Sequence, residues 1–443
     1  MISITIPNRA ATVLRVLHEA GYEAYAVGGC VRDSILGRRP NDWDITTNAM
    51  PRQIKALFRR TVDTGIEHGT VTVMIGPESF EVTTYRIDGD YSDSRYPDSV
   101  SFTTSLAEDL RRRDFTVNAM AYEPHGGLVD LFGGVKDLRD GVIRAVGEPA
   151  ERFDEDALRI MRAVRFSAQL GFSIEEKTAA ALHRFAPKLE FISRERIRDE
   201  LCKLLVSPHP EYFLRLSEAG ITAVIMPVFD RMLETEQHTP FHLYDVGHHT
   251  LKVMESVEND LVLRLCALLH DVGKVEAKKT DAAGRDHFKG HPAISARFAE
   301  SFLREYRFDN ETIRKVVRLI EVHDMRFPPS LPNVRRMLSR LGPELFPLYL
   351  KLIKADNAGQ SAYAAEEFMQ RYPGMLAAYD EIRAAGDPLS LKDLAVSGND
   401  LIAAGLKPGK ELGALLAAML EDVLETPSHN QKDYLLEHYL PKQ

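Results

Sequence analysis

Two carboxylates and a glycine pair near the start of this 443-residue chain are the residues best suited to chemistry. Gly28 and Gly29 open a short basic segment, and Asp42 and Asp44 follow it. If residues 42–45 form a strand, both carboxylates lie on one face, where they repel each other unless a cation binds. Such oxygen ligands suit Mg²⁺, and a glycine turn before a helix N-terminus suits phosphate. The order and spacing predict a site for metal-assisted transfer of a nucleotide.

Glu81 and Arg113 are two further candidates for this site, and each has a simpler explanation. Glu81 lies on an expected strand over 80–85, where it would be a third metal-binding carboxylate or a solvent-facing residue. Arg113 ends a run of three arginines, which would form a solvated helix end or, beside a triphosphate, a clamp for phosphate. The residues by themselves leave both alternatives open.

An expected helix over 155–166 carries charged residues at three-residue spacing, namely Asp156, Arg159, Arg162 and Arg165. One explanation is an amphipathic helix with internal ion pairs. The other is a reader of nucleobases, because cytosine and adenine each present an amino donor beside a ring-nitrogen acceptor. Asp156 would accept from the amino group and Arg159 would donate to the ring nitrogen, so uracil and guanine would be rejected. Arg162 and Arg165 would continue the row toward the phosphates.

Residues 238–360 contain a second set of potential ligands, made of imidazoles and carboxylates. They are His249, His270, Asp271, His291, His323 and Asp356. Groups of this kind on several helices form metal sites in bundles, and imidazole favours Mn, Fe, Co, Ni or Zn over Mg²⁺. The series, in which Val-Gly-Lys follows His270-Asp271, resembles the HD phosphohydrolase superfamily. The resemblance implies a metal site that would serve hydrolysis or only folding.

The elements expected to position these residues alternate between helices and strands in the first part of the chain. Helices are expected over 8–20, 31–36 and 51–58, and strands over 22–27, 69–75 and 80–85. The segment 86–101 is polar and rich in turn-forming residues, so a mobile loop is expected there. After about residue 375 the pattern is helical.

Composition and charge narrow the class of protein. A chain of this length should form several domains, and 44% hydrophobic with 27% charged residues is ordinary for a globular protein. No apolar run is long enough to span a membrane and the N-terminus lacks a secretory signal, so no membrane partner is expected. Three scattered cysteines argue against a disulfide framework and for the reducing cytoplasm. A net charge of −9 excludes only a uniformly basic surface, because local patches still hold phosphate.

Six segments between residue 22 and about residue 205 carry a resemblance to a known family. In order, they are GGCVRD, DWD, HGTVTV, RRDFTVNAM, EDALRIMRAVRFSAQLGF and RERIRDEL. Together they resemble the bacterial class II tRNA nucleotidyltransferases, the CCA-adding enzymes. The resemblance implies an α+β fold, in which a polymerase-β-like nucleotidyltransferase head with a mixed sheet precedes all-helical regions. Its implied domains are the catalytic head (1–145), a neck and body with the template and RNA-binding region (146–235), an HD domain (236–375) and a tail that would contact tRNA (376–443).

The resemblance also assigns roles to residues. Asp42 and Asp44 would hold Mg²⁺ at the catalytic centre, where Glu81 is the candidate third carboxylate. Asp156 and Arg159 would form a protein template. The other nucleotide-binding residues would be Gly28, Gly29, Arg32, Arg113, Asp114, Arg162 and Arg165. The segment 86–101 matches a flexible loop that enzymes adding only CC lack.

The implied activity is untemplated addition of CMP, CMP and AMP, from CTP and ATP, to the 3′ end of tRNA, with release of pyrophosphate. The HD domain would bind Ni²⁺, Co²⁺, Mn²⁺ or Fe²⁺ and act as a phosphodiesterase or phosphatase on RNA ends. Alternatives are an enzyme that adds only the terminal A, a poly(A) polymerase, or a metal phosphohydrolase whose head binds RNA without catalysis. The intact carboxylates and the Asp–Arg pair argue against the last alternative. The residues do not separate CCA addition from A-only addition.

Overall fold

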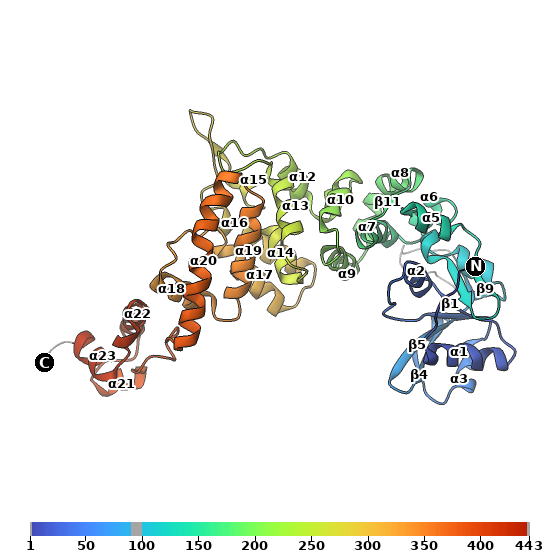
Figure 1. Cartoon of the computed structure of the whole chain (residues 1–443), viewed down its shortest axis with the longest axis horizontal. Helices are drawn as coiled ribbons and strands as arrows, with labels where there is room; N and C mark the ends of the chain where they lie inside the picture. The colour runs from blue at the N-terminus through green and yellow to red at the C-terminus, as the bar shows by residue number, and fades with distance from the viewer. Residues whose placement is uncertain (1, 90–99, 441–443) are drawn as a thin grey trace. The chain divides into compact units, whose positions relative to one another are not determined.

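The computed structural model describes residues 2–89 and 100–440, and the chain divides into two compact units, Met1–Pro227 and Val228–Gln443 (Figure 1). The first unit holds the expected mixed sheet with its helices, and the second is almost entirely helical. The expected α+β class, a sheet-containing head followed by helical regions, is therefore confirmed. Among the described residues, no helix is both long and apolar enough to cross a membrane.

A seven-stranded sheet forms the head of the first unit. Its order is β3-β4-β5-β2-β1-β8-β9, and β2 and β5 are its one parallel pair among the described strands. The strands are β1 (Ala24–Val27), β2 (Ile45–Thr47), β3 (Thr61–Gly65), β4 (Thr70–Ile75), β5 (Glu78–Thr84), β8 (Met120–Glu123) and β9 (Gly127–Asp130). Helices α1 (Asn8–Glu19) and α3 (Pro51–Leu57) pack on this sheet, as Figure 1 shows beside β4 and β5. Helix α2 (Gly29–Ile35) packs on β1 and β8 and directly follows the glycine turn.

The strand expected over 42–45 is corrected, because β2 begins only at Ile45. The last pair between β1 and β2 joins Ala26 to Ile45. Beyond it the chain turns away at Gly28, which has a φ of 78° and so ends the ladder. The alternation of faces still extends past the strand, since Trp43 is buried and Asp42 is exposed.

The ends of the loop expected over 86–101 are also corrected. Strands β6 (Arg86–Asp88) and β7 (Val100–Phe102) pair antiparallel, so the flanks of this segment form a hairpin base. Residues 90–99 lie outside the described residues. The pairing of Val- and Ile-containing flanks follows from the high strand preference of β-branched residues.

The single helix expected over 155–166 is wrong, because two helices meet there. Helix α6 (Pro149–Glu155) ends at Asp156, whose φ and ψ are −136° and 103°, and α7 (Leu158–Leu170) begins after it. Asp156 Oδ1 accepts the N–H of Leu158 at 3.0 Å, which satisfies a donor in the first turn of α7. A short carboxylate at this position favours a helix start over a helix interior.

Helices complete the first unit, and α7 packs against α9 at their centre. The remaining α-helices are α4 (Leu106–Arg111), α5 (Gly134–Asp140), α8 (Glu176–Phe185), α9 (Arg194–Leu205), α10 (Leu214–Glu218) and α11 (Thr222–Ile225). The 3₁₀ helices are η1 (Ile66–His68), η2 (Thr116–Asn118), η3 (Ala186–Phe191) and η4 (Pro210–Phe213). Strands β10 (Val142–Ile143) and β11 (Ser173–Ile174) form a short parallel pair. Helix α12 (Pro227–Leu233) spans the division between the units.

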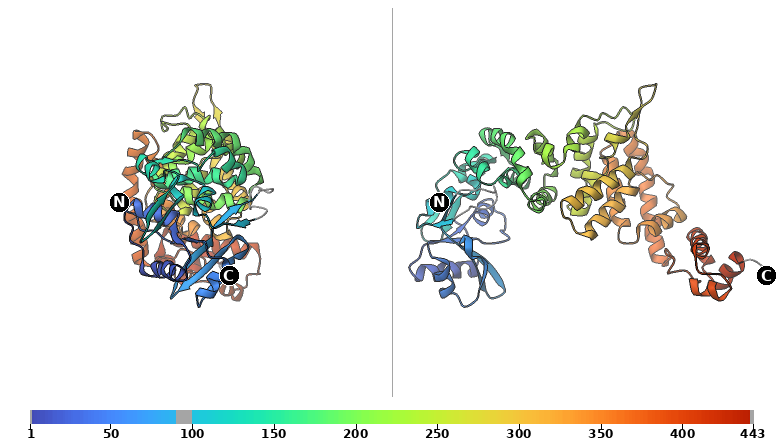
Figure 2. Two further views of the ribbon diagram at one scale, coloured as in Figure 1. Left: turned by 90° about the vertical axis from the view of Figure 1, so that its right-hand side faces the viewer. Right: turned by 180° about the vertical axis from the view of Figure 1, so that it is seen from behind.

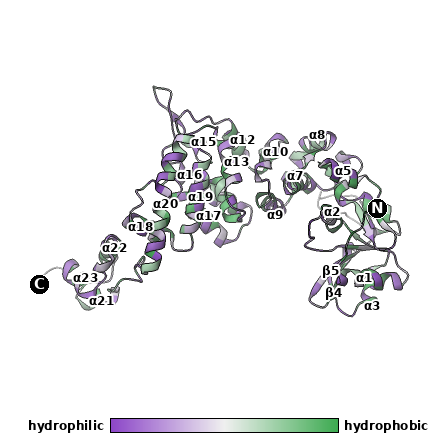
Figure 3. Cartoon of the chain, viewed as in Figure 1, coloured by the Kyte–Doolittle hydropathy of each residue, from purple (hydrophilic) through white to green (hydrophobic). Residues whose placement is uncertain are grey.

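The second unit is a helical bundle followed by a small helical tail (Figure 2). The bundle contains α13 (Val246–Ser256), α14 (Leu261–Leu269), α15 (Lys274–Ala277), α16 (His291–Glu305), α17 (Asn310–Val322), α18 (Leu331–Leu341), α19 (Phe346–Ala358) and α20 (Ala362–Ala385), with the hairpin β12 (Lys279–Thr280) and β13 (Asp286–His287). Helix α14 is buried from Leu263 to Leu269 and packs against α13, α17 and α19, so it is the core helix, and its one charged residue, Arg264, donates to backbone carbonyls. The other helices of the bundle contain hydrophilic residues as well as hydrophobic ones, which Figure 3 shows as purple and green stretches of the ribbon.

The tail contains α21 (Gly398–Ala403), α22 (Lys410–Glu425) and α23 (Lys432–Tyr439). It has an apolar cluster of its own, formed by Leu394, Val396, Leu401, Met419, Val423 and Leu435. The helical pattern expected after residue 375 is thus confirmed. Residue 375 itself lies inside α20, so that helix runs through the expected start of the tail.

Candidate nucleotide site and candidate metal centre

One cavity of about 480 Å³ in the first unit gathers nearly all residues expected at the nucleotide site. It lies where the β1–α2 turn, the segment before β2 and the helices α7 and α9 meet. Its lining consists of Gly28, Gly29, Arg32, Asp42, Asp44, Arg112, Arg113, Asp114, Asn118, Asp156, Leu158, Arg159, Arg162, Arg165, Phe166, Arg196 and Lys203. Glu81 is the one expected residue that does not line it.

The carboxylates at the edge of this cavity repel one another. Burial, and then the charges of Asp42 and Glu81, raise the pKa of Asp44 to about 6, while Arg113 opposes the rise. Glu81 is near because β2 and β5 are parallel and pair Ile45 with Val82, so Asp44 and Glu81 occupy neighbouring positions. Carboxylate oxygens held together against their repulsion fit a hard cation such as Mg²⁺.

Gly28 has a steric role as well as a conformational one. A Cβ atom at this position would lie 3.2 Å from Nη1 of Arg113, closer than ordinary contact. The positive φ favours glycine, and a Cβ would also displace the end of the Arg113 side chain by a few tenths of an ångström. The Gly28–Gly29 turn therefore lets the Arg113 guanidinium lie close to the backbone in the lining of the cavity.

A line of hydrogen bonds connects α2 to α7 across the cavity. Arg32 Nη1 donates to Asn118 Oδ1 at 2.7 Å, and Asn118 Nδ2 donates to Asp114 Oδ1 at 3.1 Å. Arg162 Nε donates to the other oxygen of Asp114 at 2.8 Å. Burial by itself would raise the pKa of Asp114, but the charge and hydrogen bonds of Arg162 hold that pKa below its usual range. Asp114 is thus an anion that orients Arg162.

Phe166 lies among three arginines of the cavity. The guanidinium carbon of Arg165 is 3.7 Å from the ring centroid, and those of Arg32 and Arg162 are 5.1 and 5.4 Å away. These distances are within the range of cation–π attraction. Burial lowers the pKa of Arg165 to about 10, against the opposing effect of Glu200, whose Oε2 lies 2.5 Å from Nε. The arginine therefore stays charged at neutral pH.

Asp109 on α4 anchors the arginine run beneath the cavity. It is fully buried, and its oxygens accept from Arg112 and Arg113 and, at 3.0 Å, from Thr46 on β2. Burial would raise the pKa of Asp109, but the two arginines lower it on balance. This carboxylate joins α4 to the strand that follows Asp44.

Asp156 and Arg159 line the same cavity without pairing with each other. Asp156 Oδ2 accepts from Arg196 Nη2 at 3.0 Å. Arg159 Nη1 donates to Glu155 at 2.6 Å and Nη2 donates to the carbonyl of Arg112 at 3.0 Å. One internal ion pair of the segment 155–166 therefore forms, from Glu155 to Arg159 across the break between α6 and α7, while Asp156 pairs with α9 instead.

Several residues of the cavity were not predicted from the sequence. They are Arg112, Asn118, Leu158, Phe166, Arg196 and Lys203 in the lining, with Asp109 and Glu200 in contact with its arginines. Six of these residues lie inside segments that carry the family resemblance: Arg112, Asn118, Leu158, Phe166, Arg196 and Glu200. The resemblance therefore marked their segments, but the sequence did not show that these side chains line the cavity or contact its arginines.

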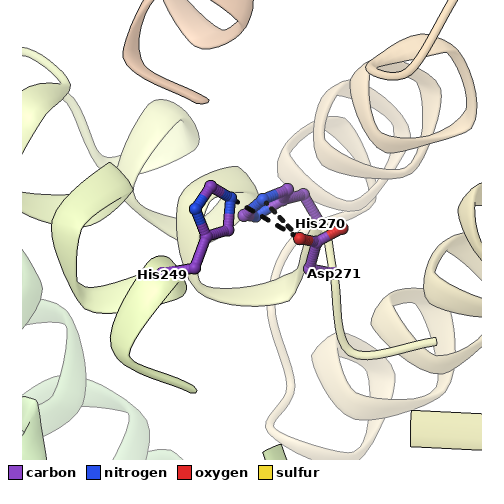
Figure 4. Close-up of side chains that lie close together, drawn as sticks. All are labelled: His249, His270 and Asp271. Atoms are coloured by element: carbon purple, nitrogen blue, oxygen red, sulfur yellow. Dashed lines mark ion pairs between the residues drawn. The ribbon is translucent and has the colours of Figure 1, made fainter. Parts of the chain in front are cut away.

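The six expected HD ligands meet in one buried cluster in the second unit, which we call the histidine cluster. His249 lies on α13 and Asp356 on α19, His270 and Asp271 follow α14, His291 begins α16 and His323 follows α17. Asp271 is central, because its carboxylate lies within 3.6 Å of Nε2 of all four histidines. Figure 4 shows His249 and His270 turned toward Asp271.

The four imidazoles all present Nε2 to the cluster. Each Nδ1 lies within hydrogen-bond distance of a backbone carbonyl, from 2.7 Å in His323 to 3.1 Å in His249. These contacts favour the tautomer with hydrogen on Nδ1, which leaves Nε2 as a lone-pair donor. Outer hydrogen bonds of this kind are typical of metal-binding histidines.

The donor set of the histidine cluster fits a metal ion. His270 Nε2 is buried without a hydrogen-bond partner, whereas Asp271 Oδ2 lies 2.7 Å from Nζ of the buried Lys274. Nε2 of His291 lies 3.2 Å from Nε2 of His323. Two groups of donors are compact enough to hold an ion: His249, His270 and Asp271, and Asp271, His291 and His323. Burial would lower the pKa of His270, but Asp271 and Asp356 raise it to about 10, so without a metal this imidazole carries a second proton, on Nε2, which a bound ion would displace.

Three family models match parts of the chain. The model described as "Poly A polymerase head domain" matches residues 24–144, and "Probable RNA and SrmB- binding site of polymerase A" matches residues 171–233. A model of the second domain of tRNA nucleotidyltransferases matches residues 292–439. The first match covers the glycine turn, Asp42 and Asp44, and the second covers α9.

Similar proteins extend over nearly the whole length. The CCA-adding enzyme of Lactobacillus helveticus is 36% identical over 437 residues, which is 98% of this chain and 96% of that protein. The CCA-adding enzyme of Enterococcus faecalis is 37% identical over 98% of this chain and 96% of its own length. The crystal structure of the Bacillus stearothermophilus CCA-adding enzyme in complex with CTP is 30% identical, with a TM-score of 0.73 and coverage of 98% of both chains. On this full-length similarity, the chain belongs to the CCA-adding enzyme family.

Proposed function

We propose that this protein adds CMP, CMP and AMP, taken from CTP and ATP, to the 3′ end of tRNA and releases pyrophosphate. The observation that carries the proposal is the single cavity that joins Asp42 and Asp44 to the arginines and to Asp156 and Arg159. A carboxylate pair beside a basic pocket suits transfer of a nucleotide from a triphosphate. Full-length similarity to CCA-adding enzymes favours this activity over poly(A) synthesis, although the head model carries the polymerase name.

Asp42 and Asp44 would hold Mg²⁺, and Glu81 would support the site through its charge on Asp44. Mg²⁺ bound there would lower the pKa of the attacking 3′-hydroxyl and offset the charge of the pyrophosphate leaving group. The arginines would offset the remaining negative charge of the triphosphate. Arg32, Arg113, Arg162 and Arg165 line the cavity with Gly28 and Gly29, and Asp114 orients Arg162 toward it.

Asp156 and Arg159 would select the base. Each carboxylate oxygen of Asp156 accepts one hydrogen bond and keeps a lone pair for a base amino group. The hydrogen bonds of Arg159 to Arg152, Glu155 and Arg112 use three of its five N–H groups, so donors remain for a ring nitrogen. One such pair accepts both cytosine and adenine.

The direct test uses tRNA that lacks its last three nucleotides. CTP alone should extend it by two residues, ATP alone should not extend it, and both together should restore CCA. Extension only of tRNA that already ends in CC would identify an A-adding enzyme instead. A long tail with ATP alone would identify a poly(A) polymerase, and no extension with intact RNA binding would leave a non-catalytic head.

A second activity is favoured by the histidine cluster. Its four Nε2 atoms around Asp271 fit a divalent transition metal such as Ni²⁺, Co²⁺, Mn²⁺ or Fe²⁺. His249, His270, Asp271 and Asp356 would hold one ion, with His291 and His323 available for a second. We infer that this HD region is a phosphodiesterase or phosphatase acting on RNA ends, because a metal in such a site supplies an activated water.

The domain assignment follows the same division of roles. Residues 1–145 would be the catalytic head, 146–235 the neck and body, 236–375 the HD domain and 376–443 a tail that contacts tRNA. Residues 397–413, which resemble the tail of HD-containing relatives, lie in and between α21 and α22. Three free cysteines among the described residues support a reducing compartment, so we place the protein in the cytoplasm.

A further inference from the structure

A small cavity in the second unit adjoins the histidine cluster. It has a volume of about 40 Å³, and His323 and Asp356 of the cluster line it. Arg326, after α17, and Arg371, on α20, line it as well. Since one water needs roughly 10–15 Å³ of such space, the cavity accepts the oxygens of a phosphate group but not a nucleobase.

Two side chains of this cavity have buried polar atoms that lack a partner. Arg371 Nε and Gln360 Oε1 are both buried without a hydrogen bond. The contact of Arg371 with Glu367, one turn earlier on α20, is long at 3.5 Å and uses Nη2. A buried N–H without an acceptor is unfavourable until a ligand supplies an oxygen, and the arginine fork matches phosphate.

An aromatic pair lies beside the cavity. The Cζ atom of Arg326 is 5.6 Å from the centroid of the Phe241 ring, and the Tyr363 ring is 6.1 Å from that of Phe241. Tyr363 is 64% exposed although it is large and partly apolar. The N–H of Ser361 donates to the carbonyl of Phe241 at 2.8 Å, which holds this loop against the start of α20. An exposed tyrosine ring beside a half-buried phenylalanine that contacts an arginine is suited to stacking of an unpaired base.

We propose that Arg326 and Arg371 bind the phosphate, and Phe241 and Tyr363 the base, of a nucleotide phosphoester at an RNA 3′ end. The inference rests on the hydrolytic role proposed for the histidine cluster and specifies its substrate as a phosphate that carries a nucleoside. Asp324 also lines the cavity and opposes an anion, so both arginines are needed to hold a phosphate dianion. The phosphate group thereby lies next to His323 and Asp356.

Calorimetric titration of the full-length, metal-loaded protein tests the proposal with two ligands, adenosine 3′-monophosphate and inorganic phosphate. Excess CTP is added so that the head cavity is filled. Arg371→Gln and Arg326→Gln should each weaken binding of both ligands about 10- to 100-fold. Tyr363→Ala should weaken only the nucleotide. Arg383→Gln is the matched control, because Arg383 is an exposed arginine on the same helix outside the cavity lining.

Metal content and hydrolysis of 2′,3′-cyclic AMP, measured on the same samples, separate this proposal from the one it rests on. If metal binds and hydrolysis occurs but the arginine variants bind like the unchanged protein, the phosphate subsite is wrong and the hydrolytic role stands. If neither metal nor hydrolysis is found, the hydrolytic role fails, while nucleotide binding that depends on Arg371 still supports the subsite. Absence of binding of both ligands to the unchanged protein overturns the whole subsite, and equal loss of both ligands in Tyr363→Ala overturns the proposed base contact.

Discussion

Asp42 and Asp44 are the single residues on which nucleotide transfer depends most. Asp42→Ala or Asp44→Ala should reduce incorporation about 1000-fold or more, because the bound metal offsets most of the developing charge. The fold should survive, since the change removes one of several repelling carboxylates. Single-turnover extension of tRNA gives the rate, and fluorescence of Trp43, the only tryptophan, reports whether the head is folded. Near-full incorporation in either variant would contradict the assignment.

The raised pKa of Asp44 predicts a pH dependence of metal binding. Below its pKa of about 6 this side chain is a neutral acid in the metal-free protein, and a neutral carboxyl is a poor Mg²⁺ ligand. The Mg²⁺ concentration for half-maximal activity should therefore rise about tenfold per pH unit below 6 and level off above it. In the absence of Mg²⁺, the same raised pKa means that the protein becomes more stable as the pH falls toward and through 6.

Glu81→Gln provides the matched comparison for this pH dependence. Removing the Glu81 charge should lower the pKa of Asp44 and move the onset of Mg²⁺ loss to lower pH. An onset that does not move in Glu81→Gln would show that Glu81 does not act on the site.

Asp156 and Arg159 should control which nucleotide is added. Asp156→Ala or Arg159→Ala should increase the share of UTP and GTP incorporated as well as slow the reaction. A lost hydrogen bond to a charged group costs about 1.5–3 kcal/mol, which corresponds to about 10- to 100-fold in discrimination. Competition assays with all four triphosphates measure this ratio. A uniform fall in rate with unchanged selectivity would make both residues structural.

At the scale of elements, Asp109 connects α4 to β2 and fixes the arginine run beside the cavity. Asp109→Asn should lower the free energy of unfolding of the head by about 2–4 kcal/mol, because Arg112 and Arg113 lose a buried charged partner. It should also raise the KM for CTP, since Arg113 is less firmly held. Urea unfolding followed by Trp43 fluorescence measures the first effect.

The control for Asp109 lies one residue earlier on the same helix. Glu108 pairs with Arg111 at the surface, with side chains 34% and 60% exposed. Glu108→Gln should therefore change stability by about 0.5 kcal/mol or less. An equal effect of both substitutions would mean that burial of Asp109 does not matter to the head.

At the scale of the whole molecule, the two sites lie in different units and use different ligands. His270→Ala with Asp271→Ala should remove bound transition metal and hydrolysis of 2′,3′-cyclic nucleotide while leaving nucleotide addition nearly intact. Asp42→Ala should do the reverse. The assay adds Ni²⁺, Co²⁺ or Mn²⁺ to metal-stripped protein, with metal content checked by elemental analysis. No turnover and no bound metal in the unchanged protein would reduce the histidine cluster to a structural role.

Much of the head was predictable because its signals are local. Helix α3 begins at Pro51, as expected from the preference of proline for the first turn, and strands rich in Val and Thr form β4 and β5. The break between α6 and α7 was missed, because apolar spacing continues through residues 155–166 while one capping carboxylate interrupts the helix. The spacing of apolar residues indicates which face of a helix is buried. It does not indicate where a side-chain oxygen replaces a backbone carbonyl as the acceptor of an N–H, which is where a helix breaks.

The sequence by itself determined which residue types can bind ligands. Asp42 and Asp44 can bind a metal, the arginines at three-residue spacing can bind phosphate, and the histidines of the second unit can bind a second metal. Only the tertiary structure decided their partners. It paired Asp156 with Arg196 and Arg159 with Glu155, placed Phe166 among arginines, and turned four Nε2 atoms toward Asp271. The physical reason is that donor type is a property of one residue, whereas charge pairing and burial depend on segments far apart in the chain that meet only when the core forms.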